Sequence, residues 1–293
     1  MPQPPWTTSV GFIFEPRLTR RSTAGKLPDL MMKRSSLGLL FVACALSASA
    51  GERLVLVGGG DLPKRARERF VEWAGGPRAK LLVILWATSE PKESYDWIRD
   101  EMATEKPANI EAAPLAPLTD ASRKEFLRQL AESTGVFFSG GDQARVMDVL
   151  KDAELLAALR ARYHAGAVFG GTSAGCAVMS TPMITGDGDF TVIDGAKVDN
   201  REGLGLLPNA IVDQHFLKRQ RENRLFGLIL KHPDMLGVGV DEATALLVED
   251  GQRGEVAGAG QVMLVDARHE PGALLLRLFK DGERIDLAKR QAP

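Results

Sequence analysis

The chain has 293 residues, of which 44% are hydrophobic and 26% charged, and its formal net charge at pH 7 is −1. These fractions are ordinary for a soluble globular protein and exclude a globally disordered chain. A charge near zero without a long basic run gives no indication of a nucleic-acid partner.

The first 50 residues have the features of an export signal. A basic segment at 31–34 precedes an apolar stretch at 37–46, and Ala48-Ser-Ala50 supplies the small residues of a signal-peptidase site. The apolar stretch is too short for a permanent membrane span. We therefore expect residues 31–50 to be a signal peptide cleaved after Ala50, so that the mature protein is secreted or periplasmic.

Two further expectations concern the start of the chain. Translation is expected to begin at Met31 or Met32, which makes residues 1–30 an extension outside the natural protein. A rival interpretation is a lipoprotein signal that ends at Cys44, although Phe41 suits such a signal poorly.

Removal of residues 1–50 changes the charge and the cysteine content. It takes away six of the 37 basic and two of the 38 acidic residues, which leaves a net charge of −5. It also leaves Cys176 as the single cysteine, so no internal disulfide is expected and stability must come from core packing.

From residue 53 onward, apolar runs alternate with amphipathic segments. Strands that are apolar throughout and separated by helices indicate a parallel sheet covered on both faces. Glycine clusters follow three of these strands, at the carboxyl ends where such sheets bind ligands. The first cluster lacks the G-x-G-x-x-G spacing and no P-loop occurs, so a nucleotide site is not expected. Strands are expected at 54–57, 81–85, 135–138 and from 168, with helices at 63–73, 122–132 and 144–159.

Residues 169–175 read Phe-Gly-Gly-Thr-Ser-Ala-Gly and have the pattern of a strand–turn–helix elbow with Ser173 at its apex. Small residues are needed there because the apex backbone is strained and the helix packs close to the strand. This geometry lifts the hydroxyl towards the free N–H groups at the start of the helix. Ser173 is therefore a candidate nucleophile, although an isolated match is as often an ordinary glycine-rich turn. Cys176, on the first helical turn, is expected to be a packing residue.

Beyond residue 179 the pattern becomes mixed. Residues 183–206 are rich in Gly and Asp, which predicts a long loop or hairpin. No linker rich in Pro and Ser divides the chain, so residues 51–293 are predicted to form a single domain. Late strands, forming an antiparallel extension, are expected at 237–240, 245–248, 262–266 and 273–279.

A serine nucleophile needs a neighbouring base, and His215 is the histidine best placed to serve as one. It follows the strand-like residues 210–212 and would lie at a strand end, where active sites form. The other histidines lie at a helix end or in predicted loops: His164, His232 and His269.

A carboxylate must orient this base, and three residues are candidates. Glu242, at the end of another apolar strand, is preferred over Asp213 and Asp241, because a neighbouring sheet position gives a better approach. Metal catalysis is rejected because the chain has no set of His and Cys ligands at short spacing, and no cofactor is expected.

A basic cluster follows the candidate base, with the sequence Lys218-Arg-Gln-Arg-Glu-Asn-Arg224. It is expected to be helical, with Arg219 near the face of His215. Such a run is usually a solvated helix face. Here its planar guanidinium groups could instead bind substrate carboxylates.

These segments together resemble the cyanophycinases, within the S51 group of serine peptidases. The resemblance implies a glutamine-amidotransferase-like α/β fold, a flavodoxin-like three-layer sandwich with a mainly parallel sheet, and a homodimer. It also implies cleavage of the polyaspartate backbone of cyanophycin, a storage polymer with arginine on each aspartate side chain, to β-Asp-Arg dipeptides. The matching segments occur in order over most of 51–266, at 138–143, 170–175, 203–208, 213–216 with the following arginines, and 237–242.

For the site, the resemblance implies that Ser173 is the nucleophile, His215 the base and Glu242 the orienting acid. The backbone N–H groups of Gly141 and Ala174 are implied as the oxyanion hole. By the same likeness, six residues are implied to bind substrate: Gln143, Asp213, Gln214, Arg219, Arg221 and Arg224. Cys176 is a mild departure, because the family usually has a smaller residue at that position.

Two alternatives to an exported cyanophycin exopeptidase stay open. An S51 relative could act on other Asp-containing or isoaspartyl peptides, with the loop at 183–206 reshaping the pocket. A catalytically inactive binding homologue is disfavoured because Ser173, His215 and Glu242 are all present. An amidotransferase is disfavoured because the apex residue is serine rather than cysteine.

Overall fold

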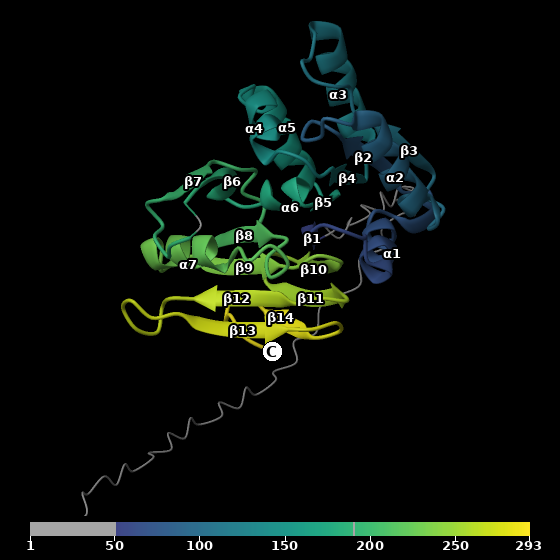
Figure 1. Cartoon of the computed structure of the whole chain (residues 1–293). Coiled ribbons are helices and arrows are strands. Elements are labelled where there is room, and N and C mark those ends of the chain that lie inside the picture. The colour runs from purple at the N-terminus through teal and green to yellow at the C-terminus, as the bar shows by residue number, and fades with distance from the viewer. Residues whose placement is uncertain (1–50, 190) are drawn as a thin grey trace, which may run out of the picture. The chain divides into compact units, whose positions relative to one another are not determined.

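Five adjacent parallel strands form one side of the main sheet in a computed structural model that describes residues 51–189 and 191–293 (Figure 1). These residues belong to one compact unit, Ser47–Pro293. The expectations for the extension, the signal peptide and the alternative at Cys44 lie outside the described residues.

The parallel strands follow the apolar runs of the sequence and adjoin in the order β1-β5-β4-β2-β3. Three antiparallel strands continue the sheet beyond β1, so the predicted mainly parallel sheet with an antiparallel extension is confirmed. The strands are β1 (Arg53–Val57), β2 (Lys80–Ile84), β3 (Asn109–Ala112), β4 (Gly135–Phe138), β5 (Val168–Thr172), β10 (Thr244–Glu249), β11 (Arg253–Gly258) and β14 (Arg284–Asp286).

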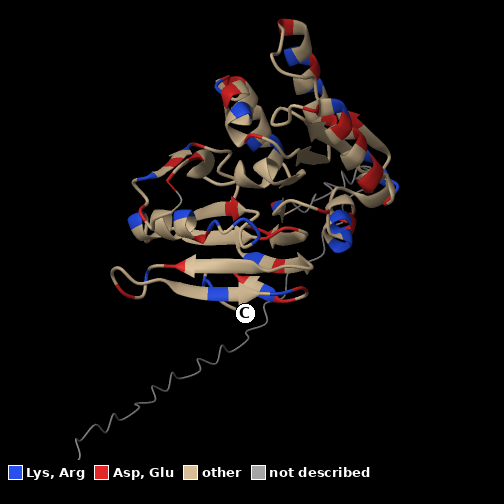
Figure 2. Cartoon of the chain, viewed as in Figure 1, with Lys and Arg blue, Asp and Glu red and all other residues tan. Residues whose placement is uncertain are grey.

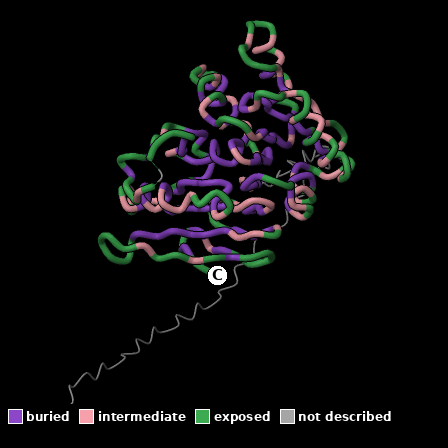
Figure 3. Tube along the Cα trace, in the orientation of Figure 1, coloured by how far each residue is buried: buried purple, intermediate pink, exposed green. Residues whose placement is uncertain are grey.

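Helices cover both faces of this sheet, which gives the expected three layers. On one face, Phe70 of α1 packs edge-on against Phe137 with ring centroids 5.4 Å apart. On the other, Tyr163 of α5 packs against Phe169 at 5.5 Å. The central strands are accordingly buried (Figure 3). The covering helices are α1 (Lys64–Trp73), α2 (Pro91–Ala103), α3 (Asp120–Glu132) and α5 (Ala153–His164), and the shorter ones are η1 (Gly76–Arg78), α4 (Gln143–Val149) and α6 (Ala174–Ala177).

The helix expected over 144–159 is in fact two helices, α4 and α5. Asp152 causes the break, because its side chain accepts hydrogen bonds from the backbone N–H groups of Glu154 and Leu155 and so caps a new helix. Helix α2 and strand β3 were not expected from the sequence.

A second, four-stranded sheet lies in the order β13-β12-β9-β8. Helix α7 (Glu222–Lys231) packs on one of its faces, where Leu225, Leu228 and Ile229 join a buried cluster with Ile211 and Val265. The late strands therefore divide between two sheets. The strands of the second sheet are β8 (Ala210–Gln214), β9 (Leu236–Val240), β12 (Val262–Asp266) and β13 (Leu275–Phe279), and the hairpin predicted within 183–206 is β6 (Met183–Gly188) with β7 (Val198–Arg201).

Charged side chains lie mainly on the helices and loops, while the strands of the main sheet carry few (Figure 2). Cys176 is fully buried in the core, as predicted for a packing residue, and its burial raises the pKa of the thiol. Within 51–189 and 191–293, no helix has the length and apolar character that crossing a bilayer requires.

Candidate active site

Ser173 sits at a sharp elbow between strand β5 and helix α6. Its backbone has φ 53° and ψ −112°, a conformation that is strained for a residue with a side chain. The N–H of Ser173 donates to the carbonyl of Val57 at 3.0 Å, which ties the elbow to β1. The glycines beside it are sterically required, since a Cβ on Gly171 would overlap the carbonyl of Gly175. The elbow predicted from residues 169–175 is therefore present.

His215 lies one residue beyond β8, with its Nε2 atom 2.7 Å from the Oγ of Ser173. Its backbone φ is 50°, and its N–H donates to the carbonyl of Gly58 at 2.8 Å. The imidazole lies against the first glycine cluster, because a Cβ on Gly59 would overlap the ring carbon Cε1. This glycine cluster, where no nucleotide site is expected, makes room for the histidine.

Glu242 completes the chain of contacts from the turn between β9 and β10. Its Oε1 atom lies 2.6 Å from Nδ1 of His215. The N–H of the next residue, Ala243, donates to the carbonyl of Gly59 at 2.8 Å and fixes the turn against β1. The other two carboxylates considered point elsewhere: Asp213 pairs with Arg224, and Asp241 accepts from the backbone N–H of Lys218.

The electrostatics suit a neutral histidine that accepts a proton. Burial lowers the pKa of His215, and the positive charges of Arg219 and Arg221 act in the same direction, although the hydrogen bond to Glu242 opposes them. The hydrogen bond from His215 lowers the pKa of Glu242, which keeps this carboxylate ionised. With Nδ1–H donating to Glu242, Nε2 is left as the acceptor for the Ser173 hydroxyl.

Two backbone N–H groups were predicted to form an oxyanion hole. Ala174 is the first residue of α6, so its N–H has no acceptor within the helix. Gly141 follows β4 with φ 131°, and a Cβ there would overlap the carbonyl of Ala87. Gly141 lines the cleft beside Ser173.

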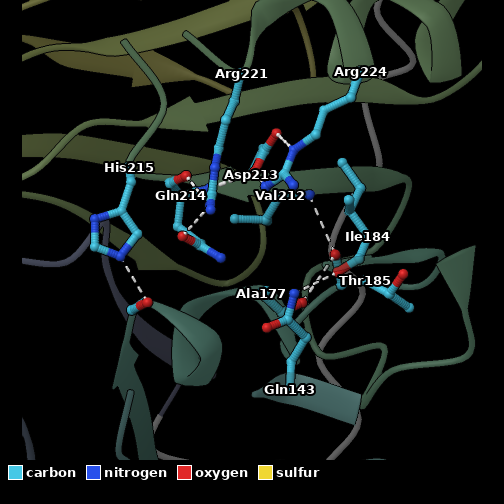
Figure 4. Close-up of polar contacts among 12 residues, drawn as sticks. Gln143, Ala177, Ile184, Thr185, Val212, Asp213, Gln214, His215, Arg221 and Arg224 are labelled. Atoms are coloured by element: carbon cyan, nitrogen blue, oxygen red, sulfur yellow. Dashed lines mark hydrogen bonds and ion pairs between the residues drawn. The ribbon is translucent and has the colours of Figure 1, made fainter. Parts of the chain in front are cut away.

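Asp213 and Arg224, both predicted to bind substrate, are paired with each other and buried (Figure 4). The guanidinium Nε donates to Oδ2 of Asp213 at 2.7 Å, and Nη2 donates to Oδ1. Oδ1 also accepts from the N–H of Gln214 at 2.8 Å. The pair therefore anchors the end of β8, and its role in binding substrate stays a prediction.

Figure 4 also shows three of the remaining residues of this predicted group, Gln143, Gln214 and Arg221. Arg221 donates from Nη1 to the side-chain oxygen of Gln214 at 2.6 Å and to its carbonyl at 2.9 Å. Gln143, at the start of α4, is buried and donates to the carbonyl of Ile184 at 2.8 Å. Arg219 is half exposed, with its Nε 3.7 Å from Oε1 of Glu242.

The basic cluster is not one helix, contrary to the expectation. Residues 216–220 form a turn, and α7 begins only at Glu222, so Arg224 is helical while Arg219 and Arg221 precede the helix. The turn includes Gln220 at φ 51°, which a helix does not allow. The arginines are thus presented from different directions.

A cleft of about 570 Å³ opens beside Ser173 and His215. It runs towards helices α2 and α4, and of the six residues predicted to bind substrate only Arg219 lines it. The glycine clusters at 58–61 and 139–142 mark part of this cleft in the sequence, but no motif marks the wall that α2 and residues 87–89 form. Side chains on these walls include Thr88, Ser89, Ser94, Trp97, Asp142 and Arg145. In the described part of the chain, no group of three or more His, Cys, Asp or Glu side chains is placed to hold a metal.

Serine-type peptidases have this arrangement: a serine on an elbow, within reach of a buried histidine that a carboxylate orients. Peptidases of this class are hydrolases. The model of peptidase family S51 matches residues 54–256, more than half of the chain. The chain belongs to peptidase family S51.

Several curated relatives carry the name cyanophycinase. The protein of Synechococcus elongatus is 37% identical over 261 residues, which cover 81% of this chain and 80% of that protein. The protein of Trichormus variabilis is 36% identical over 220 residues, 73% of each chain. These matches confirm the resemblance described from the sequence.

One solved structure shows the same fold. The crystal structure of a peptidase from an acI-B1 Actinobacterium aligns with a TM-score of 0.62 at 22% identity, covering 81% of this chain and 98% of that one. It supports the α/β architecture described above.

Proposed function

We propose that this protein is a serine-type exopeptidase that hydrolyses the polyaspartate backbone of cyanophycin and releases β-Asp-Arg dipeptides. The observation that carries the proposal is the unbroken chain of contacts from Ser173 through His215 to Glu242. The name of the curated relatives supports the substrate, since the two described above are cyanophycinases.

The proposed reaction begins when the Oγ of Ser173 attacks the scissile carbonyl while Nε2 of His215 accepts its proton. Glu242 stabilises the imidazolium that forms. The N–H groups of Gly141 and Ala174 would donate to the oxyanion of the tetrahedral intermediate. His215 then gives its proton to the leaving amine, and water, deprotonated by the same histidine, hydrolyses the acyl-enzyme.

The surroundings of Arg221 favour binding of an anionic substrate group on the β8 side of Ser173. It has no carboxylate partner among the described residues, since both of its hydrogen bonds go to neutral oxygens of Gln214. Burial and the neighbouring charge of Arg224 lower the pKa of Arg221 to about 10. A substrate carboxylate beside this guanidinium would offset the cost of its burial.

The proposal is tested by incubating the purified protein with insoluble cyanophycin and identifying the soluble products by mass. Release of β-Asp-Arg is the expected result. The alternative, an S51 peptidase of other Asp-containing or isoaspartyl peptides, predicts that only such small peptides are cleaved. A protein that cleaves none of these substrates would be the inactive binding homologue.

We also propose export after cleavage at Ala50, and a homodimer. Amino-terminal sequencing of the exported protein should begin at Gly51, whereas a lipid-modified amino terminus at Cys44 would support the rival signal. Light scattering should give twice the monomer mass.

A further inference from the structure

No part of the substrate has yet been assigned to the cleft beside Ser173, which forms one half of the substrate site. A peptidase must hold its substrate on both sides of the scissile bond. Gln214 and Arg221 lie at the end of β8, and Gln143 bonds to Ile184 of β6. None of the three lines the cleft, so they account for one side only. The cleft towards α2 and α4 is free to hold the other side.

Trp97 presents an unoccupied aromatic face in this cleft. It lies on α2 and is 38% exposed, whereas Ile98 and Met102 of the same helix are buried in the core. Two other partly exposed rings already hold cations: Arg99 stacks over Tyr95 of the same helix, and two arginines stack over Trp73. Within the described residues Trp97 has no such cation, so its indole is available to a guanidinium from outside.

Arg145 presents an unoccupied cation in the same cleft. It is exposed on α4, and among the described residues it has no ion pair or hydrogen bond. The other charged groups of the cleft are engaged: Asp142 caps α4 through the N–H of Ala144, and Arg219 lies beside Glu242. Arg145 is therefore placed to bind an incoming carboxylate, for which a guanidinium is well shaped.

We infer that Trp97 and Arg145 form a subsite for one arginyl arm of the substrate, with the arm's guanidinium on the indole and its free carboxylate on Arg145. The inference rests on the proposed function. In a polymer that yields β-Asp-Arg, each arginine is attached through its amine, so both its guanidinium and its carboxylate stay free. One arm therefore carries both a cation for the ring of Trp97 and a carboxylate for the guanidinium of Arg145.

The test is calorimetric binding to the Ser173→Ala protein, which cannot cleave the ligand. The probes are a two-unit β-Asp-Arg substrate and the same compound with its arm carboxylates amidated. Each further variant is made in this background: Trp97→Ala, Trp97→Phe, Arg145→Ala, and Arg99→Ala as a control on the same helix outside the cleft. Thermal unfolding checks that every variant is folded.

Trp97→Ala is expected to weaken binding of both probes by roughly 3- to 30-fold, and Trp97→Phe to restore most of it. Arg145→Ala is expected to weaken the free-acid probe by about tenfold and to leave the amidated probe unchanged. Arg99→Ala should bind both like its parent. Equal effects of Arg145→Ala on the two probes, or no effect of Trp97→Ala, would overturn the subsite.

A cleavage assay with the unaltered protein, which keeps Ser173, distinguishes a failure of the subsite from a failure of the proposed function. If that protein releases β-Asp-Arg while the variants bind like their parent, the subsite is wrong and the function stands. If it releases none and the Ser173→Ala protein binds neither probe, the substrate is wrong and the subsite falls with it.

Discussion

The Nδ1 atom of His215 lies 2.6 Å from Oε1 of Glu242, although the two residues are 27 positions apart in the chain. Strands β8 and β9 are parallel neighbours, so their carboxyl ends meet at one edge of the second sheet. His215 comes one residue after β8 and Glu242 two residues after β9. This contact holds Nδ1 as the donor and directs Nε2 to the Oγ of Ser173, 2.7 Å away.

The activity should fall on the acidic side because His215 must be neutral to accept the proton. Burial lowers the pKa of His215 from its ordinary value of 6.5, so protonation, and with it the loss of kcat/KM, should occur only below that pH. A pH profile of kcat/KM checks this, since the guanidinium and carboxylate of the substrate do not titrate between pH 5 and 8. An acidic limb centred above pH 6.5 would contradict the assignment.

Glu242→Gln should lower kcat by about 10³- to 10⁴-fold, because an amide can hold the imidazole in the wrong tautomer and cannot stabilise the imidazolium. Asp241→Asn is the matched control. Asp241 caps the turn at Lys218 and does not touch the histidine, so its loss should change kcat by less than about tenfold. Similar kcat values for the two variants would remove Glu242 from its proposed role.

Gly59→Ala should lower kcat by about 10²-fold or more, because the added Cβ overlaps the imidazole and displaces the base. Gly76→Ala is the control: this glycine also has a positive φ, 58°, but a Cβ there has open space. It should lower the melting temperature through backbone strain and leave kcat unchanged. Steady-state kinetics that show full activity for Gly59→Ala would mean that the imidazole is not held as described.

Asp213→Ala should destabilise the protein by about 3–5 kcal/mol, because it leaves the buried guanidinium of Arg224 without its carboxylate. The double variant Asp213→Leu/Arg224→Met removes both charges and should regain most of that loss. Urea unfolding measures both free energies. If the single and double variants are equally unstable, the stranded charge is not the cause.

The sequence predicted the parallel core and the grouping of Ser173, His215 and Glu242 because both leave local patterns. An apolar run such as 135–138 indicates a buried strand, and the glycines around Ser173 indicate an elbow that nothing bulkier can form. His215 and Glu242 followed from their places after apolar strands. These features depend on few residues at short spacing.

What the sequence did not predict depends on distant contacts. Nothing in the strands after residue 236 says which of two sheets each joins. Asp152 interrupts an apolar pattern that otherwise continues from α4 into α5. Trp97 belongs to a helix with few buried residues, and its place on the cleft arises only when α2 packs beside the strand ends.

The most direct measurement compares release of β-Asp-Arg from cyanophycin by the unaltered protein, by Ser173→Ala, by His215→Ala and by the double variant. Serine and base act as a unit, so each single variant should lose about 10³-fold or more in turnover, and the double variant little more than either. Thermal unfolding should show all four proteins folded. Release of the dipeptide by Ser173→Ala at the rate of the unaltered protein would contradict the serine mechanism.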